Sequence, residues 1–309
     1  MTLTVRNYQS ENDYHQIRAF LREVFIRNDR WEKSWHVNRW DYWTRFINAD
    51  LDPHRLDEVV FIWENSDGRI AAVLNPENSG LAFLQVHPDF RSEQLDEEMI
   101  ELAEKYLAVE TPDRGRRLNV WTDDEDLLRQ DVLKRRGYYL GKAADFHRRR
   151  PMLVPVEDTP PAAGYTVRSL GGPEELPARS YLSWRAFHPD EPDEKYQGWQ
   201  WYRHIQSAPL YRRDLDIVAV APDGALAAFC TVWYDDATRT GAFEPVGTDP
   251  SHQRRGLARA VMTEGLRRLK ETGAEFAYVA SWGEATHRLY GSLGFTDYIV
   301  SRPWVKQLG

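Results

Sequence analysis

The sequence predicts two tandem α/β domains whose strands and helices follow one another in the same order. An internal repeat is the first observation behind this prediction: short motifs of the first half recur, in order and at a nearly constant spacing, in the second half. The second observation is that both halves alternate strand-like with helix-like segments. The chain of 309 residues is also long enough for two domains that each bury a core.

Five matched motifs define the repeat, and five matches in order indicate a tandem duplication. A proline-rich stretch without hydrophobic periodicity lies between the halves, as is typical of a linker. We assign Arg148 to Pro151 to the same join. We therefore expect a first domain at residues 1–150, a linker at 151–163 and a second domain at 164–309. The matched motifs are Thr4-Val5-Arg6 with Thr166-Val167-Arg168, Trp43-Thr44-Arg45 with Trp201-Tyr202-Arg203, Asp67-Gly68 with Asp223-Gly224, Pro88 with Pro250, and Arg136-Gly137-Tyr138 with Leu293-Gly294-Phe295.

Each half contains the same predicted elements. A short strand opens the half, and a helix follows, with Ile17, Phe20 and Leu21 near one face in the first copy. After an aromatic helical segment, an Asp-Gly pair joins two strands, because this pair is a strong hairpin signal. A second hairpin, an amphipathic helix, a buried strand, a further helix and a last strand complete the half. The ranges in the two halves are 3–8 and 165–170 for the opening strand, 35–47 and 199–205 for the aromatic segment, 75–80 and 234–241 for the second hairpin turn, and 117–121 and 276–280 for the buried strand.

The composition is that of a soluble globular protein, with 42% apolar and 28% charged residues. No apolar run predicts a membrane span, and no basic-then-apolar start predicts export, so we expect a cytoplasmic protein. A net charge of −8 argues against nucleic acid as a partner and weakly favours a cationic small molecule. The single cysteine, Cys230, excludes an internal disulfide, and its apolar strand pattern predicts a buried thiol. Both a monomer and a homodimer fit these properties.

One stretch of the second half has the properties of an anion site. An apolar run with β-branched residues ends at Thr248, and two arginines and a glycine then open a helical pattern. The first turn of a helix has backbone N–H groups without partners and a partial positive charge. Gly256 leaves room for a phosphate at the backbone, and Arg254 and Arg255 supply positive charge. The alternative is a helix start with exposed arginines and no ligand.

The run Gln253-Arg254-Arg255-Gly256-Leu257-Ala258 resembles the Gln/Arg-x-x-Gly-x-Gly/Ala pyrophosphate loop of the GNAT superfamily, the acetyl-CoA-dependent N-acyltransferases. The order of elements in both halves is also similar to the GNAT order, so the resemblance covers nearly the whole chain. It implies two tandem GNAT domains, each a mixed, mostly antiparallel central sheet flanked by helices. It also implies acetyl-CoA, or another short acyl-CoA, as the cofactor, and no metal. The residues that it assigns to cofactor binding are Val246, Gly247, Thr248, Gln253, Arg254, Arg255, Gly256, Leu257, Ala258 and Arg259.

The resemblance implies two catalytic residues. Tyr290, in Leu289-Tyr290-Gly291-Ser292-Leu293-Gly294-Phe295, matches a hallmark whose tyrosine often protonates the departing thiolate, since a phenol has a proton to give near pKa 10. The strand that carries Val246 would bring a backbone N–H to the thioester oxygen. Glu244 is the candidate base, an acidic residue in an otherwise apolar strand, and Pro245 beside it predicts a bulge or a splayed strand. The alternatives are that Tyr290 only packs on the sheet and that Glu244 only faces solvent.

One position departs from the GNAT pattern, and the acceptor site is open. Gly283 stands where many members have an asparagine that helps to hold the pantetheine arm. His287 could partly substitute for it, or it could be a surface histidine. Trp184, Trp201 and Tyr202 belong to aromatic clusters that could bind the acceptor or pack the core.

The first copy lacks the parts of the site. When the prolines of the repeat are aligned, Gln94 and Asp96 occupy the positions of Gly256 and Ala258. A carboxylate at this point would repel a pyrophosphate. Leu133 takes the position of the hallmark tyrosine. We therefore expect a degenerate first domain and an active site in the second.

These features predict an N-acetyltransferase that transfers an acetyl group from acetyl-CoA to a primary amine of a small molecule by direct attack. A non-catalytic acyl-CoA-binding sensor or scaffold is the alternative from another class. The same chemistry on a mycothiol-precursor-like or aminoglycoside-like acceptor is equally open, because no motif fixes the acceptor.

Overall fold

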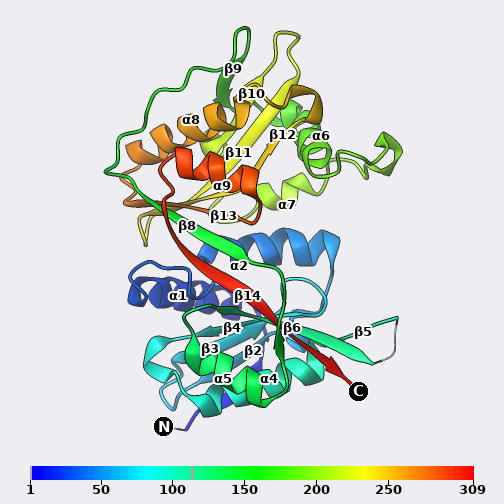
Figure 1. Ribbon diagram of the computed structural model, residues 1–309, viewed down its shortest axis with the longest axis vertical. Coiled ribbons are helices and arrows are strands. Elements are labelled where there is room, and N and C mark those ends of the chain that lie inside the picture. The colour runs from blue at the N-terminus through cyan, green and yellow to red at the C-terminus, as the bar shows by residue number, and fades with distance from the viewer. Residues whose placement is uncertain (1, 113–114) are drawn as a thin grey trace. The chain divides into compact units, whose positions relative to one another are not determined.

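The computed structural model describes residues 2–112 and 115–309, which form two compact units with separate hydrophobic cores (Figure 1). Unit 1 comprises Met1–Phe146 together with Ile299–Gly309, and unit 2 comprises His147–Tyr298. No described helix is both long enough and apolar enough to cross a membrane.

The sheet of unit 1 has the strand order β1-β2-β3-β4-β6-β14, with β5 beside β6 and β7 beside β14. β4 and β6 are parallel, and the other described pairs of this unit are antiparallel. The strands are β1 (Thr4–Asn7), β2 (Phe61–Glu64), β3 (Ile70–Asn75), β4 (Leu81–Val86), β5 (Val109–Glu110), β6 (Arg116–Asp123), β7 (Tyr139–Leu140) and β14 (Asp297–Leu308). The helices are α1 (Glu11–Arg27), α2 (Val37–Tyr42), a π-helical segment (Trp43–Leu51), α3 (Leu56–Val59), a short 3₁₀ turn (Pro88–Phe90), α4 (Glu93–Tyr106) and α5 (Leu127–Arg135).

The sheet of unit 2 has the strand order β8-β13-β12-β11-β10-β9. Its strands are β8 (Asp145–Pro151), β9 (Thr166–Ser169), β10 (Asp216–Val220), β11 (Leu226–Asp235), β12 (Thr240–Thr248) and β13 (Phe276–Ser281). The helices are α6 (Leu176–Phe187), α7 (Tyr202–Gln206), α8 (Leu257–Glu271) and α9 (Glu284–Ser292), with 3₁₀ turns at Pro173–Glu175, Asp193–Lys195, Arg213–Leu215 and Pro250–His252. Gly265 of α8 packs against Cys230, whereas the preceding Phe229 packs against Phe187 of α6. Because successive residues of a strand point to opposite faces, α8 and α6 cover opposite faces of the sheet.

The two units share one plan, as the sequence repeat predicts. Strands β1 to β4 match β9 to β12 in order and direction, and Gly68 and Gly224 both have the positive φ that their hairpin turns need. In each unit a parallel pair, β4 with β6 or β12 with β13, is in register for three residue pairs and then ends. The predicted mixed, mostly antiparallel sheet flanked by helices is confirmed.

The last strands of the two halves are exchanged. β8 comes from the first half of the sequence and lies beside β13 in unit 2, whereas the C-terminal β14 pairs with β6 in unit 1, from Ser301 opposite Asp123 to Leu308 opposite Arg116. The expectation that each half is closed by its own last strand is therefore wrong. Residues 148–151 are also strand, not linker. Hydrophobic periodicity missed this strand because its buried positions are His147, Arg148 and Arg150, and the two arginines form hydrogen bonds.

Candidate active site

The end of strand β12 has backbone groups that face away from β11. Asp249 N–H donates to the Ala227 carbonyl at 2.9 Å, and hydrogen-bonded pairs alternate with non-hydrogen-bonded pairs along an antiparallel ladder. The register Ala228 opposite Thr248 and Cys230 opposite Val246 therefore directs the backbone N–H and C=O of Thr248 and Val246 toward the β13 side. The β12–β13 ladder has already ended at Ala242. Val246, Gly247 and Thr248 remain partly exposed, so this strand end can pair with an extended ligand.

The loop after β12 leads into α8 without a side-chain cap. Gly256 is the N-cap of α8 with φ of 74°, and a Cβ atom at this position would meet no atom within 4 Å. Arg254 also has a left-handed backbone, with φ of 62°, a conformation that is uncommon for residues other than glycine. The first N–H groups of α8 are therefore open to an anion, and the helix dipole favours negative charge there.

The residues assigned to this loop divide into exposed and anchoring groups. Gln253, Arg254 and Arg255 are exposed, and the Arg255 guanidinium lies over the ring of Tyr165 at 6.0 Å. Leu257 is buried in the core of unit 2 and fixes the start of α8. Ala258 is partly buried, and Arg259 donates from its guanidinium to the side chain of Ser292 on α9. The loop can thus offer two mobile cations and a run of backbone N–H groups to a phosphate.

Tyr290 and Glu244 influence each other electrostatically. The Tyr290 side chain is 6% exposed and packs edge-on against Phe295 at 6.3 Å. Burial raises the pKa of Tyr290 to about 12, and the neighbouring Cys230 and Glu244 contribute to the same shift. A buried phenol in this state retains its proton at neutral pH, which is what a general acid requires.

Glu244 lies on a β-bulge, as the neighbouring proline predicts. Cys230 faces Val246 and Val232 faces Phe243, so the single residue between them on β11 faces both Glu244 and Pro245. The indole N–H of Trp233 donates to the Glu244 carbonyl, and the Glu244 side chain is exposed. Cys230 is fully buried and burial raises the pKa of its thiol well above the ordinary value, as the prediction of an inert thiol requires.

Comparison with known proteins finds a family match in the second half of the chain. The family model described as acetyltransferase (GNAT) family matches residues 177–295, a span that includes the loop and Tyr290. A mycothiol acetyltransferase from Sanguibacter keddieii is 27% identical over 251 residues, which cover 72% of this chain and 74% of that protein. Residues 177–295, which lie in unit 2, therefore match the GNAT acetyltransferase family.

Two solved structures support the fold over the whole length of the chain. A tandem GNAT protein from the clavulanic acid biosynthesis pathway superposes with a TM-score of 0.67 and 16% identity, covering 100% of this chain and 99% of that chain. A GCN5-related N-acetyltransferase from Sphaerobacter thermophilus superposes with a TM-score of 0.64 and 18% identity, covering 99% and 95%. At these identities the likeness concerns the fold.

The three candidate acceptor residues lie in different surroundings. Trp184 on α6 stacks with Tyr181 at 6.0 Å and lies 5.6 Å from Tyr196, in a partly exposed aromatic cluster. Trp201 meets Tyr202 edge-on at 5.4 Å. Tyr202 is fully buried, and its hydroxyl donates to the Asp216 carboxylate. Of the three, Trp184 and Trp201 are accessible to a ligand, whereas Tyr202 lies in the core.

A buried polar network lies beneath the aromatic residues, and sequence reasoning did not identify it. The Arg179 guanidinium is fully buried, donates to Asp216 at 3.1 Å and to Thr231 at 3.1 Å, and lies 3.7 Å from the ring centroid of Phe229. Unit 1 has a similar network, in which Arg18 of α1 donates to a buried aspartate. Arg18 and Arg179 are related by the spacing of the repeat, and this relation is the signal that could have revealed the pair.

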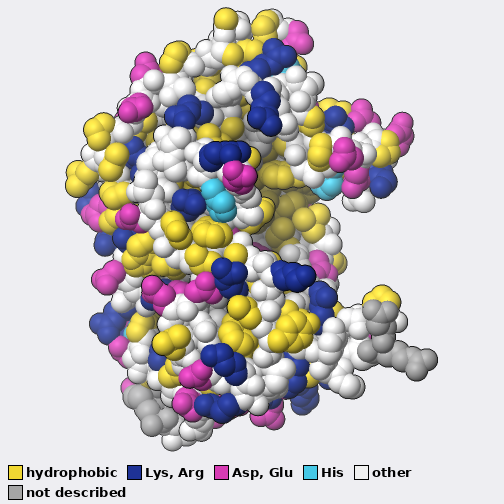
Figure 2. All heavy atoms as spheres, viewed as in Figure 1, with side chains coloured by type: hydrophobic (Ala, Val, Ile, Leu, Met, Phe, Trp, Pro, Cys, Tyr) yellow, Lys and Arg dark blue, Asp and Glu magenta, His cyan; other side chains and the backbone are white. Residues whose placement is uncertain are grey.

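Acidic side chains gather on the segment that joins α6 to α7. Asp190, Glu191, Asp193 and Glu194 lie in this segment, which projects at the right of unit 2 in Figure 2. Arg185 and Lys195 neutralise part of this charge through ion pairs with Asp193 and Glu191 at 3.8 and 3.6 Å. The remaining negative charge lies next to the aromatic cluster.

In unit 1 the corresponding strand end is filled by an ion pair. His87 N–H donates to the Ala71 carbonyl, so the same alternation directs the Leu84 carbonyl away from β3. The Arg129 guanidinium donates to this carbonyl at 3.1 Å and to Asp96 at 3.0 Å. Asp96 and Arg129 are 1% and 3% exposed.

Helix α4 of unit 1 also has the cap that α8 lacks. The Ser92 side chain accepts a hydrogen bond from Leu95 N–H at 3.2 Å, and Glu93 and Asp96 lie in the first turn. A side-chain oxygen and carboxylates thus satisfy the start of α4. Unit 1 thus has Gln94 and Asp96 where unit 2 has Gly256 and Ala258. The two helix starts differ both in charge and in whether a side chain caps the backbone N–H groups.

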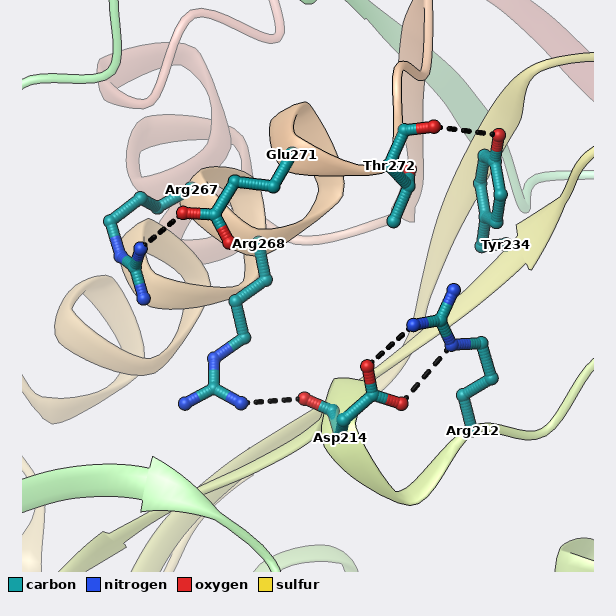
Figure 3. A pocket seen from close by; sticks show the side chains of 7 residues that line it. All are labelled: Arg212, Asp214, Tyr234, Arg267, Arg268, Glu271 and Thr272. Carbon is teal, nitrogen blue, oxygen red and sulfur yellow. Dashed lines mark hydrogen bonds and ion pairs between the residues drawn. The ribbon is translucent and has the colours of Figure 1, made fainter.

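A separate cavity of about 400 Å³ lies at the other end of α8 (Figure 3). Its charged groups are held in ion pairs: Arg212 pairs with Asp214 at 2.5 Å, Arg267 with Glu271 at 2.5 Å, and Arg268 with Glu264 outside the lining at 2.6 Å. The cavity lies about 20 Å from the loop along the helix, given the rise of 1.5 Å per residue. It is therefore not part of the candidate active site. Its lining residues are Arg212, Asp214, Tyr234, Arg267, Arg268, Glu271 and Thr272.

Among the described residues, no group of three or more histidine, cysteine or acidic side chains could hold a metal ion.

Proposed function

We propose that this protein transfers an acetyl group from acetyl-CoA to a primary amine of a small molecule, and that unit 2 carries the reaction. One observation carries the proposal: the phenol of Tyr290 is buried in the core of unit 2, against which Val246 of β12 packs, and the backbone groups at this end of β12 have no strand partner on the β13 side. With Glu244 two residues before Val246 on the same strand, this arrangement supports a site with a proton donor, a proton acceptor and backbone donors.

The loop from Gln253 to Arg259 fits the pyrophosphate of an acyl-CoA. Gly256 has open space where a side chain would stand, the first turn of α8 has no side-chain cap, and Arg254 and Arg255 are exposed. The outward backbone groups of Val246 and Thr248 fit an extended arm with amide groups, such as pantetheine. Bound acetyl-CoA supplies an activated acetyl thioester.

The residues of the chain then have distinct roles. Glu244 takes the proton of the amine, directly or through a water molecule, because an amine is mostly protonated at neutral pH. The N–H of Val246 stabilises negative charge on the acyl oxygen. Tyr290 donates its proton to the leaving sulfur, and its raised pKa keeps that proton in place beforehand.

We further propose that the acceptor approaches from the side of α6. The aromatic cluster around Trp184 offers flat surfaces for stacking, and the acidic segment between α6 and α7 favours a positively charged molecule. Trp201 would line the same side, and Tyr202 would support it from the core. The name of the Sanguibacter keddieii relative makes a mycothiol-precursor-like amine one acceptor to test, with aminoglycosides as another.

The substitution Tyr290→Phe tests the proposal. It removes the proton donor and retains the ring that packs on Phe295, so kcat should fall by about 100-fold while acetyl-CoA affinity stays nearly constant. Release of free CoA across a panel of amines measures the first quantity, and calorimetry measures the second. Tyr234→Phe is the matched control, because this phenol bonds to the Thr272 carbonyl at the far end of α8.

Two results would contradict the proposal. Unchanged turnover of Tyr290→Phe would remove the phenol from the reaction. Binding of acetyl-CoA without CoA release for any amine would favour the alternative, an acyl-CoA sensor.

A further inference from the structure

Arg148 reaches unit 2 on strand β8 and uses each of its three nitrogens. Its Nε donates to the Ser281 hydroxyl at 2.8 Å, one terminal nitrogen donates to the Phe295 carbonyl at 3.1 Å, and the other lies 3.2 Å from His287 Nδ1. The guanidinium is thus bonded to three segments that are far from it in sequence.

These three acceptors bracket Tyr290. Ser281 ends β13 and leads into α9, and His287 lies on α9 one turn before Tyr290. Phe295 follows α9 and packs edge-on against the Tyr290 ring. The Arg148 side chain therefore holds three parts of the chain: the start of α9 through Ser281, the helix itself through His287, and the residue that packs against the phenol, Phe295.

The chemistry of the groups determines the direction of every bond. Arginine has only donors, so His287 Nδ1 accepts, and the proton of a neutral imidazole is then on Nε2. Ser281 accepts from Arg148, and its own hydroxyl lies 2.9 Å from the same His287 Nδ1, so the hydroxyl and the guanidinium share the single lone pair of this nitrogen. His287 consequently anchors α9 to β8 and β13. This role does not depend on contact between His287 and a pantetheine arm.

Arg148 is buried, so water cannot replace its hydrogen bonds in a variant that lacks the guanidinium unless the chain moves. Arg148 is 8% exposed and Ser281 is 1% exposed, and the ring of Tyr298 lies 5.0 Å from the guanidinium carbon. Burial lowers the pKa of Arg148, which reflects the cost of holding a cation there. A buried group that costs free energy and contacts three segments at once is suited to fixing their geometry.

We propose that Arg148 is a positioning residue for the reaction: it holds α9 so that the phenol of Tyr290 stays buried at the end of β12. This inference rests on the proposed function, in which Tyr290 donates a proton. It also gives the first half of the sequence a role in unit 2, because the strand that carries Arg148 belongs to that half.

A double-mutant cycle tests the inference. Arg148→Gln should lower kcat by about tenfold or more in the parent protein, with little change in acetyl-CoA affinity, but should lower it no further in Tyr290→Phe. Arg149→Gln is the matched control, because successive strand residues point to opposite faces and Arg149 pairs instead with Asp297 at 3.9 Å. It should leave kcat unchanged.

A second readout does not depend on activity. In protein labelled with ¹³C at the tyrosine rings, the Tyr290 signal at a pH of about 11 should remain that of a neutral phenol in the parent and in Arg149→Gln. In Arg148→Gln the phenol should become more exposed and ionise at this pH. If Arg148→Gln does not fold, Ser281→Ala and His287→Ala each remove one acceptor and should shift the same signal in the same direction.

The outcomes separate the inference from the proposed function. Equal loss of kcat in both backgrounds would show that Arg148 only supports the fold, and an unshifted Tyr290 signal in the folded variants would overturn the inference. Unchanged turnover of Tyr290→Phe would instead contradict the proton-donor role, and the NMR signal would still decide whether Arg148 positions the phenol.

Discussion

At the scale of single residues, the buried phenol of Tyr290 has a measurable effect on stability at alkaline pH. Its folded-state pKa is raised to about 12, above the ordinary value of about 10, chiefly by burial. The stabilisation linked to the bound proton is therefore complete below pH 10 and is lost as pH rises toward 12. The parent should lose about 2 to 3 kcal/mol of unfolding free energy over this range relative to Tyr290→Phe. Urea unfolding of both proteins on either side of the range measures it, and parallel curves would contradict the prediction.

The Asp96–Arg129 pair makes a second prediction at this scale. Asp96→Ala removes the carboxylate and leaves the buried Arg129 cation without it, so unit 1 should lose about 3 to 5 kcal/mol of stability. The double variant Asp96→Ala/Arg129→Leu removes both charges and should recover much of this loss. Chemical unfolding followed in unit 1 measures both values. A double variant no more stable than Asp96→Ala would show that the pair is not the main cause.

At the scale of elements, the proposed function predicts that the start of α8 controls pyrophosphate binding by unit 2. Gly256→Glu adds a carboxylate and a side chain at a φ of 74°, so it should abolish acetyl-CoA binding by calorimetry. Gly256→Ala adds only the strain and should weaken binding less. The matched substitution in unit 1, Gln94→Gly, should leave binding unchanged, with one equivalent of acetyl-CoA per chain in the parent. Two equivalents would contradict our assignment of the site to unit 2 alone.

The two helix starts differ in ways that sequence and structure reveal separately. The replacement of Gly256 by Gln94 is visible in the repeat and predicts a difference in charge and space. The Ser92 cap follows from the same comparison only when the helix boundary is known, since α4 begins at Glu93 and α8 begins at Leu257. The filling of the strand end by Arg129 depends on a contact between α5 and β4 that no local pattern encodes.

At the scale of the whole molecule, the exchanged strands make each unit depend on the other half of the sequence. A chain that ends at Tyr298 lacks the part of β14 that pairs with β6, and it also lacks Trp304, which packs in the core of unit 1. Unit 1 should therefore unfold at a markedly lower temperature in this truncated protein, because a sheet edge and a large apolar side chain are lost. Calorimetry with and without acetyl-CoA separates the two units. An unchanged first transition would contradict the prediction.

The sequence by itself determined the duplication, the order of elements and the half that carries the anion loop. These features are local: hairpin signals, apolar periodicity, and a glycine and arginines at a helix start are set by neighbouring residues. The comparison of Gly256 with Gln94 needed no coordinates, because the second copy serves as a reference for the first. The resemblance to the GNAT superfamily followed from the same motifs, namely Gln253 to Ala258 and Tyr290 with Phe295, and the family model matches the residues that contain them.

The tertiary structure alone decided which strand completes which sheet and which side chains hold the site. Arg148 is a charged residue in an unpatterned stretch, and only the fold brings it to Ser281, His287 and Phe295. The outward backbone of Val246 depends on its register against β11. Pairing between distant segments depends on long-range packing. Its free energy is shared among many residues, so it produces no periodic pattern in the sequence of either segment.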